Sequence, residues 1–275
     1  MGAMCGRAKA CGRGRRGVAL LGWLMLGTLA CGEFTPLPLP IDGAQLHRVL
    51  DDRSLLFTGQ SNAAAAAYTP AAEARAQLYN QAALRTWQDG WQHGDASKSG
   101  HKPPGVGLLA GALGWLLEEE YQLPVALLGQ PQPAANIAWM APAGDNYNML
   151  LDRVVASGSR PAVLLWHQGE SDGIEHTSEQ QYRQALNELI AAWRSDFVDL
   201  QYIVVFLTSV NACGYDQSQV RAAQRAVAAM HDDVLLVDAD ALTGTAAHLD
   251  GCHYDWMGYE AQAMLALHAI SFPPR

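Results

Sequence analysis

The chain has 275 residues, of which 49% are hydrophobic and 16% are charged, and its formal net charge is −9. This length fits one α/β domain or two small ones, and the composition excludes a disordered chain. Because the surface is acidic and the sequence contains no basic patch, nucleic acid is excluded as an expected partner, and so is an anionic membrane surface.

The first thirty residues have the composition of a leader. Five basic residues between Arg7 and Arg16 precede an apolar run at residues 18–30. This run is shorter than the roughly 20 residues that span a membrane, and it is typical of a secretory signal. We therefore expect residues 1–30 to be a signal peptide. Its removal takes away five positive charges and changes the formal net charge from −9 to −14.

The leader predicts an exported protein that is periplasmic, secreted or lipid-anchored to a bacterial membrane. The sequence TLAC, which ends at Cys31, is similar to a lipoprotein cleavage box, so Cys31 is a candidate lipidation site. Plain cleavage by signal peptidase is the alternative. Contact with a membrane is expected only through the signal or this lipid. Residues 31–45 contain the run TPLPLP and are predicted to form a tether, and residues 46–275 to form the folded domain.

Five short apolar runs follow the pattern of strands that are buried on both faces of a parallel sheet, because each run is continuous rather than alternating. They lie at residues 54–58, 125–129, 162–167, 202–208 and 234–239. Predicted helices lie between or after them, at residues 108–121, 146–157, 178–197, 217–230 and 256–270. This alternation predicts the α/β class, as a three-layer α/β/α sandwich with a five-stranded parallel sheet.

Residues 68–105 do not fit this alternation. The segment is long and rich in Gln, Ala, Trp and His, and long insertions beside a strand end are often functional. Trp87 and Trp91 are four residues apart, so we expect them on one face of a helix, either as core residues or as a platform for stacking sugars.

Ligands of such sheets bind beyond the carboxyl ends of the strands, and polar motifs occupy these positions. Ser61 lies in GQSN, at the bend between the first strand and a helix, where its hydroxyl is exposed and its N–H faces a developing oxyanion. We expect Gln60 and Asn62 to hold the shape of this bend through hydrogen bonds. We also expect Asn62 to reach the reacting end of the substrate.

A serine nucleophile needs a base, and the base needs a group that orients it. His253 is the candidate base, and Asp250, three residues earlier, can reach its imidazole and fix the tautomer.

Candidate oxyanion donors are the Gln168 amide, which follows a buried strand, and a backbone N–H of Gly105 or Gly107. Glu170 is expected to support the loop structurally by accepting hydrogen bonds from backbone N–H groups. Its alternative role is that of a second general base.

Four blocks in this order, GQSN, a GxG before a helix, WHQGESD and DGCH, resemble the carbohydrate-esterase branch of the SGNH-hydrolase superfamily. This branch includes sialate O-acetylesterase-like proteins and acetylxylan esterases. The resemblance spans residues 54 to about 270. It implies a flavodoxin-like sheet, no metal and no cofactor.

The resemblance also implies roles for single residues. The family's catalytic serine, histidine and aspartate fall on Ser61, His253 and Asp250, and Gln168 stands where other SGNH enzymes use Asn. The glycine block reads GVG where the family often has GPG, so the choice between Gly105 and Gly107 stays open.

The sequence thus predicts an exported serine esterase that removes acetyl groups from carbohydrate through an acyl-enzyme on Ser61. One alternative is a lipase or thioesterase on the same scaffold. Another, from a different class, is a surface carbohydrate-binding protein with a decayed active site.

Cys213 and Cys252 remain once the leader and Cys31 are set aside. Both lie in polar, loop-like stretches of a chain that is expected to be exported, which favours a disulfide between them. Two free buried thiols are the alternative.

Overall fold

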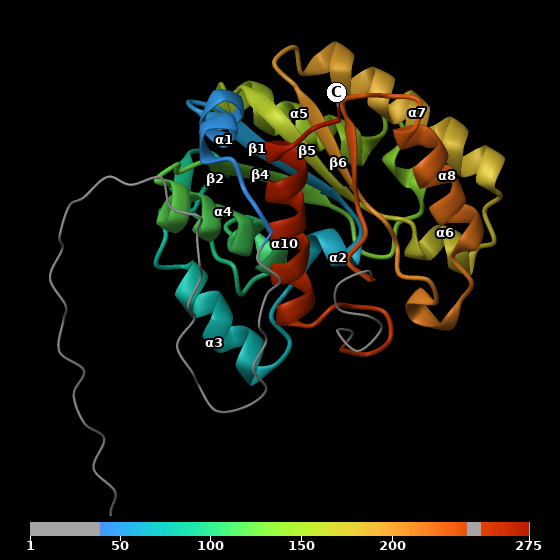
Figure 1. Cartoon of the computed structure of the whole chain (residues 1–275), viewed down its shortest axis with the longest axis horizontal. Coiled ribbons are helices and arrows are strands. Elements are labelled where there is room, and N and C mark those ends of the chain that lie inside the picture. Colours follow the sequence, from blue (N-terminus) through green and yellow to red (C-terminus); the bar gives the residue numbers. More distant parts are fainter. Residues whose placement is uncertain (1–38, 241–248, 275) are drawn as a thin grey trace, which may run out of the picture.

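A seven-stranded sheet forms the centre of the protein, whose computed structural model describes residues 39–240 and 249–274 (Figure 1). The strand order is β3-β2-β4-β1-β5-β6-β7, and every neighbouring pair is parallel except β2 with β3. The strands are β1 (Ser54–Gly59), β2 (Arg85–Trp87), β3 (Trp91–His93), β4 (Ala126–Pro131), β5 (Pro161–His167), β6 (Tyr202–Phe206) and β7 (Val234–Val237). The predicted leader and Cys31 lie outside the described residues.

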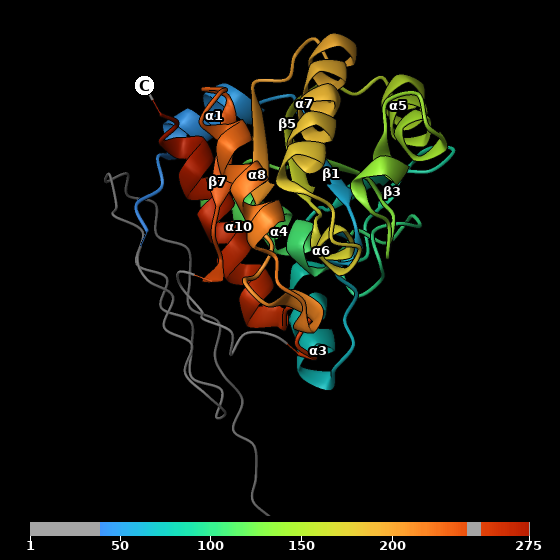
Figure 2. The same ribbon diagram turned by 90° about the vertical axis from the view of Figure 1, so that its right-hand side faces the viewer.

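Helices cover both faces of this sheet (Figures 1 and 2). One face packs against α1 (Gly43–Leu50), α4 (Gly107–Tyr121) and α10 (Trp256–Ser271). The other packs against α5 (Asp145–Ser157), α7 (Glu179–Asp196) and α8 (Ser218–Ala228). The remaining helices of the described residues are α2 (Ser61–Ala64), α3 (Pro70–Tyr79), α6 (Glu170–Ile174), η1 (Ile137–Met140) and η2 (Ala212–Gly214). None of the described helices is both long and apolar enough to cross a membrane.

Strand β1 shows why the apolar runs are continuous. Leu55 and Phe57 belong to one hydrophobic core, whereas Leu56 belongs to the core on the opposite face. Successive side chains of a strand point to opposite faces, so a strand that is covered on both sides carries apolar residues at consecutive positions. The predicted three-layer sandwich with a parallel sheet is confirmed.

The five predicted strands are all present, and β2 and β3 are additional. They form a hairpin within the segment 68–105, and Trp87 and Trp91 are directly paired across it, with ring centroids 5.4 Å apart. The predicted helix at this place is wrong. Asp89 and Gly90 both adopt positive φ, and this Asp-Gly pair is a hairpin signal that outweighs the four-residue spacing.

The predicted start of the domain at residue 46 is also slightly late. Helix α1 begins at Gly43, within the predicted tether, because the Asp42 side chain caps it by accepting a hydrogen bond from the Gln45 N–H at 3.2 Å.

Gly59 allows the end of β1 to pass close to β5. Its φ is +130°, and a Cβ atom placed on it would lie 2.1 Å from the His167 carbonyl oxygen. The next residue, Gln60, donates its N–H to the same oxygen at 3.0 Å. This close backbone approach places the bend before Ser61 directly beside the end of β5.

We predict that Gly59→Ala lowers the free energy of unfolding by at least about 3 kcal/mol, since it adds a backbone clash to an unfavourable φ. Gly90→Ala is the matched control. Its φ is +147°, but nothing lies within 4 Å of an added Cβ. It should cost only about 1–2 kcal/mol. Denaturant unfolding measures both values, and equal losses would contradict the role of the close approach.

Candidate active site

Ser61 is the first residue of α2, directly after β1. The N–H groups of Ala64 and Ala65 donate to the carbonyls of Gln60 and Ser61 at 3.0 and 2.8 Å. The N–H of Ser61 therefore has no acceptor within the helix, as is usual in a first turn. Ser61 itself is half-buried. The sequence thus places a hydroxyl and a backbone donor at the carboxyl end of the central strand.

His253 and Asp250 form a hydrogen-bonded pair in the loop before α10. The imidazole Nδ1 lies 2.8 Å from Asp250 Oδ2, and Asp250 Oδ1 accepts the N–H groups of Cys252 and His253 at 2.9 and 2.7 Å. Partial burial opposes ionisation of Asp250, but the hydrogen bonds from His253 and the backbone outweigh it and lower the pKa of this carboxyl to about 2. The carboxylate stays charged near neutral pH and orients the imidazole so that Nε2 remains available.

Tyr68 lies near this pair and is exposed. Its side chain is 65% exposed, and its ring centroid is 6.3 Å from that of His253. Among the described residues, Ser61 Oγ and His253 make no hydrogen bond with one another. Such catalytic contacts often tighten only when substrate binds.

Asn62 connects α2 to the loop that carries His253. Its Nδ2 donates to Glu170 Oε1 at 2.6 Å and to the Cys252 carbonyl at 3.2 Å. Its Oδ1 accepts the Tyr254 N–H at 3.4 Å and the Tyr259 hydroxyl at 2.9 Å. Asn62 is fully buried, so the expected contact of this side chain with substrate is not what the structure shows.

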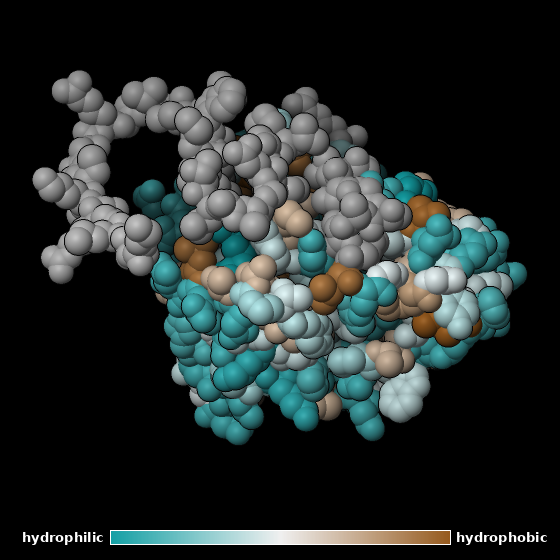
Figure 3. Space-filling model, turned by 90° about the horizontal axis from the view of Figure 1, so that it is seen from below, coloured by the Kyte–Doolittle hydropathy of each residue, from teal (hydrophilic) through white to brown (hydrophobic). Residues whose placement is uncertain are grey.

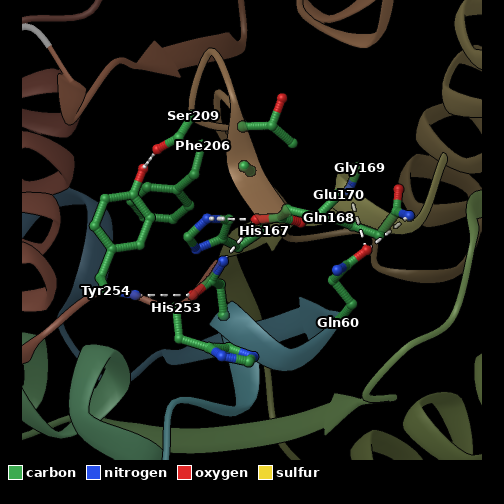
Figure 4. A network of polar contacts seen from close by, with 12 residues as sticks. Gln60, His167, Gln168, Gly169, Glu170, Phe206, Ser209, His253 and Tyr254 are labelled. Carbon is green, nitrogen blue, oxygen red and sulfur yellow. Dashed lines mark hydrogen bonds and ion pairs between the residues drawn. The ribbon is translucent and has the colours of Figure 1, made fainter. Parts of the chain in front are cut away.

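Gln60 and Gln168 also lie inside the protein, and Figure 4 shows both within the polar network. Gln60 Oε1 accepts from Gln168 Nε2 at 3.2 Å and from the N–H groups of Gly169 and Ser171 at 3.3 and 3.2 Å. This agrees with the expectation that Gln60 holds the shape of the bend.

The Gln168 amide has further acceptors in Asp172 Oδ2 at 2.5 Å and the Ala135 carbonyl at 3.2 Å. Both amide protons are therefore used within the fold. In this geometry Gln168 does not present a free donor to an oxyanion, because burial and these three acceptors fix its amide in the interior.

The two candidate glycines are engaged in the same way. Gly105 N–H donates to the Lys102 carbonyl at 3.0 Å, and Gly107 N–H donates to the Lys98 carbonyl at 2.9 Å. Gly107 has φ +75° and packs against α2, since an added Cβ would lie 2.3 Å from the Ala64 carbonyl oxygen. Close packing against α2 thus explains why residue 107 is a glycine. Both glycine N–H groups already have an acceptor within the fold.

Glu170 lies beneath the site. It is buried together with His167, and His167 Nε2 is 3.7 Å from Glu170 Oε1. Burial raises the pKa of Glu170, although the hydrogen bond from Asn62 opposes this effect. A hydrogen bond from the backbone N–H of Glu170 itself also opposes the rise in pKa. The side chain therefore contacts both Asn62 and a backbone N–H group of its own loop.

Sequence reasoning missed the turn after β4. Gln132 N–H donates to the Gly59 carbonyl at 2.7 Å, so this turn lies beside the end of β1. Ala134 has φ +59°, and the Ala135 carbonyl accepts from Gln168 at 3.2 Å. This turn contacts the site through backbone N–H and carbonyl groups, so no pattern of side chains in the sequence indicates its role.

Two further contacts hold the His253 loop. Cys213 and Cys252 are joined by a disulfide, the pairing that the sequence favours, with Cα atoms 4.1 Å apart. Figure 4 shows the Tyr254 hydroxyl meeting Ser209, at 2.6 Å. Ser209 in turn donates to Asp240 Oδ1 at 2.7 Å. The loop is therefore fastened to the segments that follow β6 and β7.

No group of three or more His, Cys, Asp or Glu side chains within the described residues is arranged to hold a metal ion.

The fold thus places Ser61 and the Asp250–His253 pair in segments that follow the sheet, where ligands of such sheets bind. The chain belongs to the family described as "Carbohydrate esterase, sialic acid-specific acetylesterase", whose model matches residues 53–267. Membership makes the protein a carboxylic-ester hydrolase of the carbohydrate acetylesterase type. No curated protein sequence matches the chain.

Solved structures share the fold. A protein from Arabidopsis thaliana is 19% identical with a TM-score of 0.61, covering 80% of this chain and 96% of that chain. A carbohydrate acetylesterase from Xanthomonas citri is 18% identical with a TM-score of 0.58, covering 79% and 55%. An acetylxylan esterase from Geobacillus stearothermophilus is 14% identical with a TM-score of 0.54, covering 82% and 96%.

We predict that replacing both Cys213 and Cys252 by Ser lowers stability and activity together. The closed loop has a sequence separation of 39 residues. In the chain-entropy model such a bridge contributes roughly 3–4 kcal/mol. Activity should fall because the disulfide ends one residue before His253.

Denaturant unfolding and hydrolysis of 4-nitrophenyl acetate, each with and without reductant, measure these effects. The double Ser variant is the control and should not respond to reductant. If fully reduced wild-type protein, with two free thiols found by mass spectrometry, keeps its stability and rate, the prediction is wrong.

Proposed function

We propose that this carbohydrate esterase removes O-acetyl groups through an acyl-enzyme on Ser61. The observation that carries the proposal is the Asp250–His253 hydrogen bond of 2.8 Å, in a loop that Asn62 ties to the start of α2. A histidine that is oriented by a carboxylate beside a serine at a strand end has the components that acyl transfer requires.

The reaction proceeds in two halves. Ser61 Oγ attacks the ester carbonyl carbon while His253 Nε2 takes the hydroxyl proton, and Asp250 stabilises the resulting imidazolium. The proton then passes to the departing sugar oxygen as the C–O bond breaks, which leaves an acetyl ester on Ser61. Water attacks this ester by the same route, and acetate leaves with Ser61 reprotonated.

The oxyanion of each tetrahedral intermediate is assigned to the N–H of Ser61, since this donor has no acceptor within α2. The predicted roles of Gly105, Gly107 and Gln168 as donors would each require an existing hydrogen bond to break. The proposal therefore does not depend on them.

Carbohydrate fits the surroundings of His253 better than a long acyl chain does. Tyr68 offers an exposed ring beside the imidazole, and the C–H face of a pyranose packs on such rings. On the coloured part of the face that Figure 3 shows, apolar residues are scattered among hydrophilic ones. A lipase would need a continuous apolar surface for its substrate. The preserved Asp250–His253 pair supports an enzyme rather than a decayed binding protein.

Export is part of the proposal. The predicted signal peptide at residues 1–30 and the disulfide between Cys213 and Cys252 both suit an oxidising compartment. Lipid attachment at Cys31 stays a prediction, with plain cleavage as its alternative.

Ser61→Ala should keep the fold and lower kcat for 4-nitrophenyl acetate by at least about 10³-fold, since the nucleophile is lost. Circular dichroism and thermal unfolding establish that the variant is folded. Wild-type protein should label stoichiometrically with a fluorophosphonate probe, whereas the variant should not. Hydrolysis at the wild-type rate by folded Ser61→Ala would remove the mechanism.

Tyr68→Ala should raise KM for acetylated oligosaccharides by about 5- to 20-fold, because a stacking contact is worth about 1–2 kcal/mol. It should change kcat/KM for 4-nitrophenyl acetate less than two-fold. Phe272→Ala is the control, since Phe272 is 50% exposed but follows the opposite end of α10. An equal effect of Tyr68→Ala on both substrates would argue against a sugar platform. In a series of esters of increasing acyl length, preference of the wild-type protein for long chains would argue against the deacetylase.

A further inference from the structure

The hydrogen bonds of Asn62 are distributed around His253. The Cys252 carbonyl, directly before His253, accepts from Asn62 Nδ2 at 3.2 Å, and the Tyr254 N–H, directly after it, donates to Asn62 Oδ1 at 3.4 Å. Fixing the backbone on both sides of His253 fixes the position of its Cα and Cβ atoms. Because Asn62 follows Ser61 in the chain, one amide group relates the nucleophile to the base.

We propose that Asn62 is a positioning residue that holds His253 in reach of Ser61, and that buried Glu170 anchors the Asn62 amide. This inference rests on the proposed roles of Ser61 and His253. Asn62 does not touch the substrate, since its side chain is fully buried. It acts through the backbone of the loop.

The partners of Asn62 allow only one orientation of its amide. A backbone N–H can only donate and a carbonyl can only accept, so Nδ2 must face Cys252 and Oδ1 must face Tyr254. The remaining proton of Nδ2 meets Glu170 Oε1 at 2.6 Å, and the remaining lone pair of Oδ1 meets the Tyr259 hydroxyl at 2.9 Å. All four bonds are satisfied at once, and a flipped amide would lose both backbone bonds, because the Cys252 carbonyl cannot donate and the Tyr254 N–H cannot accept.

Glu170, which anchors the Asn62 amide, is itself held in place at the same edge of the sheet. Glu170 begins α6, directly after the bend that Gln60 holds by accepting the Gly169 and Ser171 N–H groups at 3.3 and 3.2 Å. The GQSN and WHQGESD segments therefore hold one another in place through these hydrogen bonds. Glu170 belongs to the second segment, so its bond to Asn62 fixes the Asn62 amide relative to both. A carboxyl oxygen is needed here only as an acceptor, which the amide oxygen of a glutamine can also supply.

Asn62→Asp tests the donor function, because Asp has the same shape and keeps Oδ1 but lacks the N–H groups. We expect kcat for 4-nitrophenyl acetate to fall by about 10- to 100-fold, since a displacement of about 1 Å of a catalytic group costs about this much. KM should change less than three-fold.

Asn80→Asp is the matched control for this change. The Asn80 amide also donates to a carboxylate, Asp95 Oδ1 at 3.1 Å, and accepts a backbone N–H, that of Ala96 at 2.8 Å. It has no bond to the His253 loop among the described residues. Its kcat, corrected for the folded fraction, should stay within two-fold of wild type, and an equal loss in both variants would overturn the proposal.

Recovery of activity in a double variant separates the role of Glu170 as anchor from a general loss of structure. In Glu170→Gln, the amide oxygen of the introduced side chain still accepts from Asn62, so kcat should stay within about three-fold of wild type. In the double variant Asn62→Asp/Glu170→Gln the bond re-forms in the reverse direction, from the introduced amide to the introduced carboxylate. The kcat of this double variant should be at least five-fold higher than that of Asn62→Asp alone. No recovery, or a loss in Glu170→Gln as large as in Ser61→Ala, would overturn the anchor.

Tyr259→Phe keeps the test open if Asn62→Asp does not fold. It removes one donor to Asn62 Oδ1 without changing the shape of the core, and we expect kcat to fall about three- to ten-fold at constant KM. Tyr147→Phe is the control, because it removes a comparable hydroxyl contact, with Asp196 at 2.5 Å, on α5. Equal rates for Tyr259→Phe and wild type would count against positioning.

Failure of this inference is distinguishable from failure of the proposed function. If Ser61→Ala abolishes hydrolysis while Asn62→Asp and Tyr259→Phe both retain wild-type kcat, the mechanism stands and the positioning role is overturned. If Ser61→Ala retains hydrolysis, the proposed function itself is overturned, and the inference that rests on it fails too.

Discussion

The buried amide of Asn62 is the interaction on which the geometry of this site depends. It lies in α2, just after the central strand, and its four hydrogen bonds reach α6, the loop before α10 and α10 itself. A buried polar group without partners is costly, so a fully satisfied one selects a single arrangement of its neighbours. The reacting residues lie nearer to solvent, because Asp250 is exposed and His253 is only partly buried.

The polar residues of the sequence motifs fall into two groups within this arrangement. Ser61 and the loop of Asp250 and His253 face the open edge, whereas Gln60, Gln168 and Asp172 are buried and bonded to one another. Burial raises the pKa of Asp172, but hydrogen bonds from Gln168, the Ile137 N–H and Thr177 oppose this. WHQGESD is thus largely a scaffold that fixes the bend at Ser61, and its polar residues follow from the requirement that buried donors and acceptors be paired.

The sequence was sufficient for the layers and insufficient for the contacts between motifs. The predicted strand at residues 54–58 and β1 differ by one residue, because a buried parallel strand leaves a continuous apolar run. The β2–β3 hairpin was missed since its strands have only three residues each, too few for a recognisable apolar pattern. The direction of the Gln168 and Asn62 side chains was also missed, because an amide just beyond the end of a strand can turn to the interior or to solvent. Only the position of its partners decides between them.

Fastening the His253 loop at several points has a physical reason. Residues 249–255 contain Gly251 with φ +77° and no regular secondary structure, so the free loop would sample many conformations. The disulfide restrains it at Cys252, the Ser209 contact restrains it at Tyr254, and Asn62 bonds to both of these residues. His253 is the residue between the two restrained positions. The entropy that would be lost on placing a mobile imidazole near Ser61 is therefore already lost on folding, and the base is oriented before any substrate arrives.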